Sequence, residues 1–583
     1  MSLDPWRPIA NGTYLGTDAS KRFPMYTRGN AGEVFPEVQY PLSFTSSWAA
    51  WQLAGERSVA FSGLLTRKEM AGDPTAFGGT FGGYTYLNLS AFRVAAVRAP
   101  GTKVADIDDQ FLGTSTAPPY APQRGDRSLR ASLAALAYGM RTLKATALPQ
   151  LTDDAVRAEV WRNGLPDPST ATDRQLIDEA AQATAFAAEL FEHHLIVSAQ
   201  ASVPVGLLAQ TCKKKLHDPS MIGRLLAGVG DIASAAPSDG LWDLGRLVAT
   251  DSALTALFDA GVTGLEQRLA TEAAPTALSF REAFAAFLGV HGSRGRNEWE
   301  TACPTWGTNP EIALALVDRM RHAAADHDPR VRHGALVLDR EAAIAEAAPK
   351  LGRRRTKRLR RLVASAALYS QGRERAKTTV VDVIHSCRLL QRELGRRCAA
   401  RSGGQANDLW FVTIDELEPY VADPAAFADS IAERRRMREL LSTREPPFTI
   451  NGTVPAFETW ARKDANTTTA VAAGEVMTGI GGCPGVARGR ARVILDPSDP
   501  SALGPGDVLV APITDPAWTP LFVPAEAVVV DVGAMLSHAV IVSRELGIPA
   551  VVSVRDATKR IPNGALIEVD GTKGTVTILE LPG

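Results

Sequence analysis

The spacing of apolar residues changes abruptly near residue 442, and this change constrains the fold more than any other feature of the sequence. From Ser128 onward, alanine-rich stretches carry apolar residues at helical spacing. After about residue 472, short β-branched runs alternate with glycine and proline, which is typical of a compact sheet domain. A chain of 583 residues is also too long for one hydrophobic core. We therefore expect a multidomain α+β protein.

These patterns divide the chain into three parts. Residues 1–441 are expected to form one large domain, rich in loops and short strands over 1–125 and mainly helical over 126–441. Residues 442–472 lose all periodicity and gather Pro, Thr and Asn, which is typical of an interdomain linker. Residues 473–583 are expected to form the sheet domain.

The sheet domain is predicted in most detail. Its β-branched runs predict strands at 486–495, 507–512, 527–532, 549–554, 565–570 and 575–579. The run at 537–547 has helical spacing, with Ser537 suited to the N-cap and Gly547 to the C-terminal stop. The domain should therefore contain a helix between two strands, with His538 in its first turn.

Bulk composition excludes several classes of function. The 63 basic and 64 acidic residues give a formal net charge of -1, so no overall field favours nucleic acid or an anionic membrane. The five cysteines are widely spaced and include no CxxC pair, which indicates reduced thiols rather than zinc or redox chemistry. We find neither a signal-peptide pattern nor a run of about 18 apolar residues. We expect a cytoplasmic protein that binds neither nucleic acid nor membranes.

Three glycine-rich or basic strings have two interpretations each, and the second is the commoner in proteins. The string FGGTFGGY (77–84) is either a phosphate cradle or a turn before a short strand. The run RRRTKRLRR (353–361) either attracts phosphorylated ligands or is a solvated helix face. The string GVGDIA (228–233) is either a dinucleotide loop, which it imitates only weakly because no strand precedes it, or part of the surrounding helical texture. The histidines are not spaced as metal ligands, and we expect no metal site.

The predicted position of His538 has chemical meaning. A neutral imidazole is a competent nucleophile near pH 7, and its phosphorylated form retains a high transfer potential. The amides and the positive dipole end of a helix N-terminus can hold an anionic phosphoryl group without a further basic side chain. A lone histidine after a serine is usually structural, so the surrounding residues must decide between the two interpretations.

Motifs around His538 favour the catalytic interpretation. They are TDPAWTPLF (514–522), SHAVIVSRE (537–545) and GIPAVV (547–552). With them, residues 505–554 closely resemble the mobile, swivelling phosphohistidine domain of phosphoenolpyruvate-utilising enzymes. The resemblance implies a small β/β/α domain in which His538 is phosphorylated, and in which Ser537, Gly533 and Thr514 support the phosphate.

Five segments of the N-terminal part occur in the order of matching segments in rifampicin phosphotransferase-like proteins. They are NAGEVFPEVQYPLSFT (30–45), GGYTYLNLS (82–90), HGSRGRNEWETACPTW (291–306), YSQGRERAKTTV (369–380) and NDLWFVTIDEL (407–417). In rifampicin phosphotransferase-like proteins, the matching segments build the acceptor-substrate domain. The resemblance implies that a large, mostly helical acceptor-binding domain, residues 1–441, precedes the swivelling domain.

Transfer from phosphohistidine to a hydroxyl needs positive charge on the non-bridging oxygens. Arg294, Arg373 and Lys377 are the favoured candidates, because arginine binds phosphoryl oxygens bidentately and the last two share a helix face. The alternative is a surface ion pair of these cations with neighbouring acids such as Glu374. His291 or Glu298 is a candidate to accept or position the proton of the acceptor.

We find no ATP-grasp domain and no P-loop in the sequence, so the chain has no evident means to charge its own histidine. We therefore expect a separate ATP-grasp subunit that binds ATP and Mg2+, an arrangement similar to that of phenylphosphate synthase. No cofactor is expected on this chain. The predicted linker of about 30 residues would have a reach of about 30 Å, enough for a swivel between neighbouring sites.

Two other functions stay open. One is a non-enzymatic binding or regulatory homologue that has lost its phosphate-charging module. The other is phosphorylation that activates an alcohol for a later step. The acceptor is expected to be a small organic hydroxyl or phenolic compound. Trp299, Trp306 and the aromatic residues at 77–86 suit the binding of such a compound, and the alternative is that they belong to the hydrophobic core.

Overall fold

The computed structural model describes residues 19–71, 73, 75–113, 117–230, 232–233, 235–463, 471–496, 503–504, 506–534 and 537–582. The N-terminal elements are β1 (Met25–Thr27), α1 (Ala31–Val34), α2 (Pro41–Ser62), α3 (Arg67–Met70), β2 (Gly78–Phe81), β3 (Tyr84–Asn88), α4 (Leu89–Arg98) and α5 (Val104–Leu112). The central elements are α6 (Leu129–Lys144), α7 (Pro149–Asn163), α8 (Asp173–Thr211), η1 (Cys212–Leu216), α9 (Met221–Leu225), α10 (Ala236–Thr250), α11 (Ser252–Asp259), α12 (Leu265–Thr271), α13 (Pro275–His291), α14 (Pro310–His322), η2 (Ala325–His327), α15 (Pro329–Leu351) and α16 (Arg353–Ser402).

The later elements complete the chain. The large part ends with η3 (Ala406–Phe411), η4 (Ile414–Glu416), α17 (Leu417–Ala422), η5 (Pro424–Phe427), α18 (Ala428–Ser442), β4 (Thr449–Asn451) and η6 (Phe457–Thr459). The C-terminal domain contains β5 (Val476–Thr478), β6 (Ile480–Cys483), β7 (Val486–Val493), β8 (Asp507–Ala511), η8 (Pro516–Trp518), α19 (Thr519–Phe522), β9 (Ala527–Val530), α20 (His538–Leu546), β10 (Ala550–Val552), α21 (Ala557–Arg560), β11 (Leu566–Asp570) and β12 (Thr575–Glu580).

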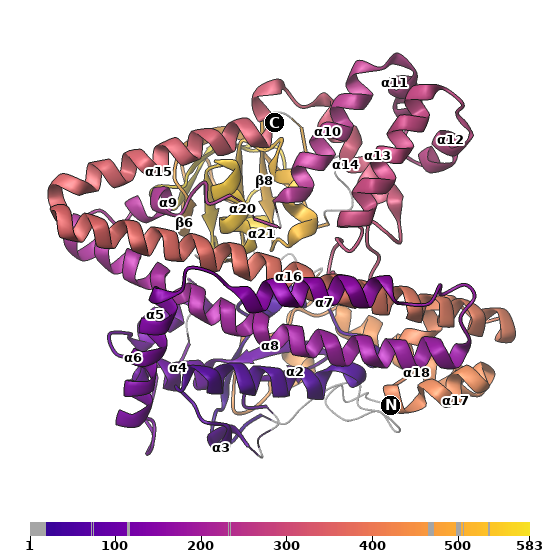
Figure 1. Cartoon of the computed structure of the whole chain (residues 1–583), viewed down its shortest axis with the longest axis horizontal. Helices are drawn as coiled ribbons and strands as arrows, with labels where there is room; N and C mark the ends of the chain where they lie inside the picture. The colour runs from indigo at the N-terminus through magenta and orange to yellow at the C-terminus, as the bar shows by residue number, and fades with distance from the viewer. Residues whose placement is uncertain are drawn as a thin grey trace.

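The two longest helices organise the large part. The 50-residue α16 packs lengthwise against the 39-residue α8, and both lie beside α2 and α7 (Figure 1). Ala180, Ala183 and Ala187 of α8 are buried in this contact, and their small side chains let the helices approach closely. The mainly helical character predicted for 126–441 is confirmed, and with it the multidomain α+β fold.

Within the described residues, one helical stretch, Asp173–Leu216, is long and apolar enough by composition to cross a membrane. A core helix of a globular protein meets the same criteria, so a single such helix is weak evidence for a membrane span. Its apolar side chains enter three separate core clusters, with Leu176, Val197 and Leu216 as buried examples. Packing within the protein therefore accounts for part of the apolar character of this stretch, of whose most apolar window 33% is buried.

The N-terminal part contains more helix than the sequence suggested. Its four-stranded sheet has the order β2-β3-β1-β4, and all its pairs are antiparallel. Gly82 and Gly83 join β2 to β3 with φ of 57° and 74°, so the turn interpretation of FGGTFGGY is confirmed. The expectation of loops and strands over 1–125 overlooked the 22-residue α2, because Pro41 looks like a breaker although it stands at the start of the helix.

Most of the predicted linker is folded. Residues 449–451 form β4, which pairs with β1, and Phe457 and Trp460 are buried against the N-terminal sheet. The segment lacks periodicity because it is a short edge strand followed by turns, and this pattern looks like a linker in sequence. Residues 464–470 lie outside the described residues. The backbone N–H of Val471 already donates to the carbonyl of Arg560, in the C-terminal domain.

The C-terminal domain contains an eight-stranded sheet in the order β5-β12-β11-β7-β8-β9-β10-β6. Strands β7 to β10 pair in parallel with one another, and the other pairs are antiparallel. The six predicted strands are confirmed as β7 to β12. Strands β5 and β6 were overlooked because glycines interrupt VMTGIGGC (476–483) and weaken its strand pattern.

The C-terminal domain lies against helices of the large part. Figure 1 shows it next to α9 and α15, and α10 packs against its short helix α19. One hydrophobic cluster is shared by Leu241 of α10, Phe522 of α19 and Val540 of α20. Arg332 of α15 also donates from Nη1 to the carbonyl of Val523 at 3.3 Å. The domain is therefore held by both apolar and polar contacts, with α20 facing the large part.

Two of the strings with alternative interpretations are resolved by the fold. The described residues of GVGDIA, 228–230 and 232–233, lie between α9 and α10 and outside any helix, and Gly228 and Gly230 adopt φ of 57° and 71°, so the helical texture expected here is wrong. The N–H groups of Val229 and Gly230 each donate to the carboxylate of Glu545 at 3.0 Å. The RRRTKRLRR run begins α16 and is mostly exposed, which confirms a solvated helix face.

Candidate functional site

His538 begins α20, and two threonine hydroxyls contact its ring. Thr514 Oγ1 lies 3.1 Å from Nδ1, and Thr519 Oγ1 lies 3.0 Å from Nε2. The ring of Phe522 packs edge-on against the imidazole, with centroids 6.0 Å apart. Thr514 was predicted from the sequence and Thr519 was not, although both lie in the TDPAWTPLF motif. The ring orientation of His538 is therefore fixed by residues of one segment, 514–522.

The surroundings keep His538 neutral. The pKa of this imidazole is held well below its ordinary value of 6.5, first by burial and then by Lys377, Arg294 and Arg373, while Glu374 acts in the opposite direction. A neutral imidazole has one N–H donor and one nitrogen lone pair. Because a hydroxyl can donate or accept, the two threonines satisfy both ring nitrogens. The ring therefore has the protonation state that a nucleophile needs.

Arg294, Arg373, Lys377 and Glu298, all predicted from the sequence, lie together on the side of the large part that faces His538. Arg373 and Lys377 lie on α16, and Lys377 Nζ is 3.5 Å from Glu298 Oε1. Arg294 is 1% exposed, and its guanidinium lies 3.3 Å from the same carboxylate and donates to Thr378 Oγ1 at 2.6 Å. This buried arrangement places two cations beside one carboxylate.

The alternative that Arg373 makes an ion pair is also realised, but not at the surface. Arg373 Nη1 contacts the carboxylate of Glu374, whose side chain is 4% exposed. Both side chains are enclosed where α16 faces the C-terminal domain. The pair therefore belongs to the same enclosed group as His538, and the interpretation as a solvated surface pair does not apply.

Glu33 is a site residue that the sequence analysis missed. It lies on α1, in the matched segment 30–45, and is half-buried. Burial raises the pKa of its carboxyl to about 7, while Arg373, Lys377 and a backbone hydrogen bond from His538 lower it. This carboxylate therefore lies at the N-terminus of α20 among the cations of α16. No local pattern identifies it, because its role depends on elements that are distant in the sequence.

Ser537 and Gly533 lie beside the histidine as predicted. Ser537 occupies the N-cap of α20, but its side chain makes no capping bond, and its buried Oγ has no partner among the described residues. A Cβ added to Gly533 would lie 2.9 Å from the Cβ of Val552 and 3.2 Å from Ser537 Oγ. Glycine therefore leaves room for the serine, whose hydroxyl is available to a ligand.

Asp515 connects the two parts of the chain at this site. Its carboxylate accepts from the backbone N–H of Asn297 at 3.1 Å and from that of Ala517 at 2.9 Å. Burial and nearby Glu298 raise the pKa of Asp515 to about 6, against the effect of these hydrogen bonds. This contact fixes the TDPAWTPLF segment to the loop that carries Arg294 and Glu298.

His291 lies apart from this group. It ends α13 beside Phe287, with ring centroids 5.0 Å apart. Burial and Arg294 lower its pKa to about 4. Within the described residues, no contact of His291 reaches His538. In the same part of the chain, no group of three or more His, Cys, Asp and Glu side chains is arranged to hold a metal ion.

Comparisons with known proteins match both parts of this site. Residues 193–374 match the rifampicin phosphotransferase fourth domain, and residues 503–574 match the mobile domain of PEP-utilising enzymes. The second match contains His538 and both threonines that contact it. The chain thus carries a PEP-utilising mobile domain on the C-terminal side of a rifampicin phosphotransferase-like region.

Similar whole proteins are longer than this chain. Prodigiosin synthesizing transferase PigC of Serratia marcescens is 28% identical over 577 residues, which cover 95% of this chain and 63% of PigC. Rifampicin phosphotransferase of Bacillus subtilis is 29% identical over 310 residues, which cover 51% of this chain and 34% of that enzyme. An uncharacterized phosphotransferase of the same organism, YvkC, is 37% identical over 177 residues, 30% of this chain and 21% of YvkC. The chain thus spans less than two thirds of these relatives.

Proposed function

We propose that this chain receives a phosphoryl group on His538 and delivers it to a hydroxyl of a small organic acceptor. One observation carries the proposal: the neutral imidazole of a PEP-utilising mobile domain faces Arg294, Arg373 and Lys377 of the large part. A phosphoryl group on this ring would be surrounded by positive charge, which stabilises the non-bridging oxygens during transfer.

The delivery step balances with groups of this chain. The oxygen of the acceptor hydroxyl forms the new P–O bond while the P–N bond of phosphohistidine breaks. The electron pair of the P–N bond returns to the imidazole, which becomes neutral again. Glu33 is our candidate to take the hydroxyl proton, because its carboxyl has a pKa of about 7 and lies among the cations of α16. Ser537 Oγ is free to donate to a phosphoryl oxygen.

His291 is not our choice for the proton acceptor, although it was a candidate from the sequence. Its described contacts lie with Phe287 and Arg294, away from His538. Glu298 is better suited to positioning, because its carboxylate already pairs with Arg294 and Lys377. Its expected role is to hold the two cations in place rather than to move a proton.

Charging of His538 requires a second arrangement of the domains. In the present arrangement His538 is 7% exposed, so a donor as large as a nucleotide-binding domain cannot reach it. The C-terminal domain would have to leave the large part and turn toward the donor. The connection from residue 463 to residue 471 spans at most about 28 Å when extended. The donor site should therefore be adjacent to the position that the domain occupies here.

The donor is expected to be a separate ATP-grasp subunit that binds ATP and Mg2+, so the whole enzyme would be an ATP-dependent phosphotransferase of the dikinase type. The reaction is expected to take place in the cytoplasm.

A second candidate function is suggested by PigC, which is named a prodigiosin synthesizing transferase and whose match covers 95% of this chain. In that case the phosphoryl group would activate the acceptor for a later bond-forming step. A non-enzymatic homologue remains the contrasting alternative.

The test mixes the full chain with a candidate ATP-grasp donor protein and with ATP that is labelled at the β or γ phosphate. We expect acid-labile, alkali-stable label on the wild-type chain and none on a His538→Ala variant. Equal labelling of the two proteins would refute His538 as the carrier. A complete lack of labelling with ATP-grasp proteins, including one fused to this chain, would favour the non-enzymatic alternative.

A further inference from the structure

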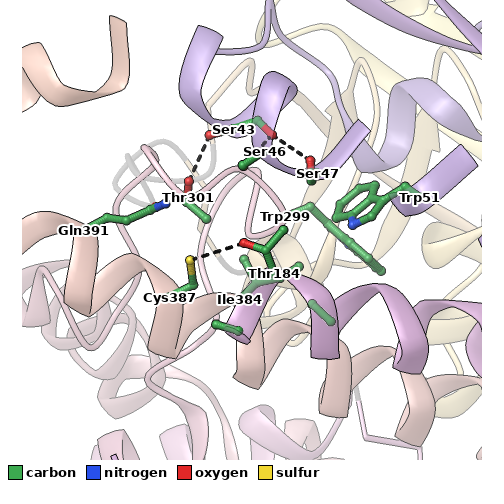
Figure 2. Close-up of a pocket in the computed structure, with 12 residues that line it drawn as sticks. Ser43, Ser46, Ser47, Trp51, Thr184, Trp299, Thr301, Ile384, Cys387 and Gln391 are labelled. Carbon is green, nitrogen blue, oxygen red and sulfur yellow. Dashed lines mark hydrogen bonds between the residues drawn. The ribbon is translucent and has the colours of Figure 1, made fainter. Parts of the chain in front are cut away.

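A small pocket lies between α2, α8 and α16, next to the loop that contains Trp299. Figure 2 shows Trp51 and the serines of α2 on one side, with Thr184 of α8 and Gln391 of α16 on the other. Its volume of about 30 Å³ is enough for about two water molecules. The pocket therefore suits one small group at the end of a larger molecule.

Buried polar atoms at this pocket have no partner. The indole N–H donors of Trp51 and Trp299 and the side-chain oxygen of Gln391 are buried and make no hydrogen bond within the described residues. Trp299 is 5% exposed and Gln391 is 3% exposed, so bulk water does not satisfy them. Such atoms are uncommon in folded proteins because each one carries an uncompensated desolvation cost.

The hydroxyl groups of the pocket are already occupied, unlike the indoles and the amide. Ser43 Oγ contacts a carboxylate oxygen of Glu300 and lies 2.9 Å from Thr301 Oγ1. Thr184 Oγ1 donates to the carbonyl of Ala180 at 3.0 Å. The unsatisfied groups are therefore two donors and one acceptor, and a matching ligand would present an acceptor and a donor close together.

Aromatic rings pack around the two tryptophans of the pocket. The rings of Trp51 and Trp299 meet edge to face with centroids 5.7 Å apart. Phe35 packs on both of them, at 5.4 and 6.4 Å, and Phe191 does so at 5.0 and 5.6 Å. Of these rings, Trp51 and Trp299 line the pocket, and their indoles favour a flat, unsaturated group, because ring faces and edges attract one another.

The pocket adjoins the phosphoryl-transfer site. Trp299 follows Glu298, which pairs with Lys377 and Arg294. Phe35 directly follows α1, the helix of Glu33. A molecule anchored in the pocket beside Trp299 therefore lies close to Glu298 and to the two cations that pair with it.

We propose that this pocket anchors the acceptor, and that the acceptor is a planar heteroaromatic compound with a lactam-like edge. Its carbonyl oxygen or ring nitrogen accepts from the indole N–H groups, and its N–H donates to Gln391. Its hydroxyl lies at the opposite end of the ring system, toward His538. This assignment rests on the proposed function and adds the chemical class of the substrate.

The experiment measures binding to the full chain by calorimetry with two probes. 7-Hydroxy-2-quinolone has a lactam edge opposite its hydroxyl, whereas 2-naphthol has the same flat shape and hydroxyl without that edge. We expect the quinolone to bind about 10-fold or more tightly than the naphthol, since several hydrogen bonds are added. Trp299→Phe and Trp51→Phe should each weaken quinolone binding by about 3- to 10-fold and leave naphthol binding unchanged.

Trp306→Phe is the matched control. Trp306 is also buried with an unpartnered N–H among the described residues, but it packs on Phe287 outside this pocket. Quinolone binding should be unchanged in this variant. Equal binding of the two probes, or unchanged quinolone binding in both pocket variants, would overturn the assignment.

Binding and transfer can be separated by the His538→Ala variant, which should bind the quinolone like the wild type. Binding with the expected tryptophan dependence supports the pocket even where no label reaches His538, a result that would count against the proposed function alone. Labelling of His538 together with tryptophan-independent binding would leave the proposed function standing and overturn the pocket.

Discussion

Removal of the Glu545 carboxylate should release the C-terminal domain from the position seen here. Glu545 lies on the same helix as His538, and its carboxylate accepts from the N–H groups of Val229 and Gly230, each at 3.0 Å. His333 of α15 also approaches it, with 3.6 Å between Nδ1 and Oε2. The Glu545→Ala variant loses all three contacts and leaves the rest of α20 unchanged.

The size of the effect follows from these contacts. A hydrogen bond to a charged group contributes about 1.5–3 kcal/mol, and water replaces part of that contribution when the side chain is removed. Two such bonds together give a net loss of about 2–3 kcal/mol for the docked arrangement. This corresponds to a factor of about 30–150 in the docking equilibrium, since about 1.4 kcal/mol is a factor of ten.

Hydrogen exchange measured by mass spectrometry reports docking without any acceptor or donor. In the Glu545→Ala variant, the amides of the 228–233 loop should exchange faster by about the same factor, because exchange follows the opening equilibrium. Glu568→Ala is the control, since Glu568 pairs with Arg488 at 2.6 Å inside the C-terminal domain. Unchanged exchange in the Glu545 variant, or an equal change in the control, would refute this account of docking.

Three further predictions concern the site. Glu33→Gln should slow delivery by about 100-fold or more, since the base must be a carboxylate. In the wild type the transfer rate should rise as the pH passes through about 7, and the variant should lack this rise. An unaltered pH profile would exclude Glu33 as the base. Thr519→Val should leave the fold intact and slow transfer by about 10-fold, because one hydrogen bond to the imidazole is lost, and rapid-quench kinetics measure it. Arg294→Met should destabilise the large part by about 3–5 kcal/mol in denaturant titration, because Glu298 keeps its buried charge with one cation fewer; a change below about 1 kcal/mol would contradict that charge balance.

Local patterns predicted the C-terminal domain well. Each β-branched run between turn residues is a strand in the structure. As expected, Ser537 lies at the N-cap of α20 and Gly547 at its C-cap. Strand identity depends mainly on neighbouring residues, so the sequence contained the necessary information. The N-cap hydroxyl of Ser537 is the exception, because it makes no bond to its own helix.

The elements that the sequence did not predict depend on contacts between distant segments. β4 is a strand only because β1 offers it a partner, and Glu33 is a site residue only because α16 and α20 meet it. The loop at 228–233 gains its role from Glu545, far along the chain. Such residues lack a local signal, and sequence patterns identify them only after the fold is known.

A chase experiment tests the central claim most directly. The protein labelled on His538 is separated from ATP and its donor and then mixed with the acceptor. We predict that label leaves His538 while an equal amount of phosphate ester forms on the acceptor hydroxyl. Label that remains on the protein, or that leaves as inorganic phosphate at the same rate with and without acceptor, would contradict the account.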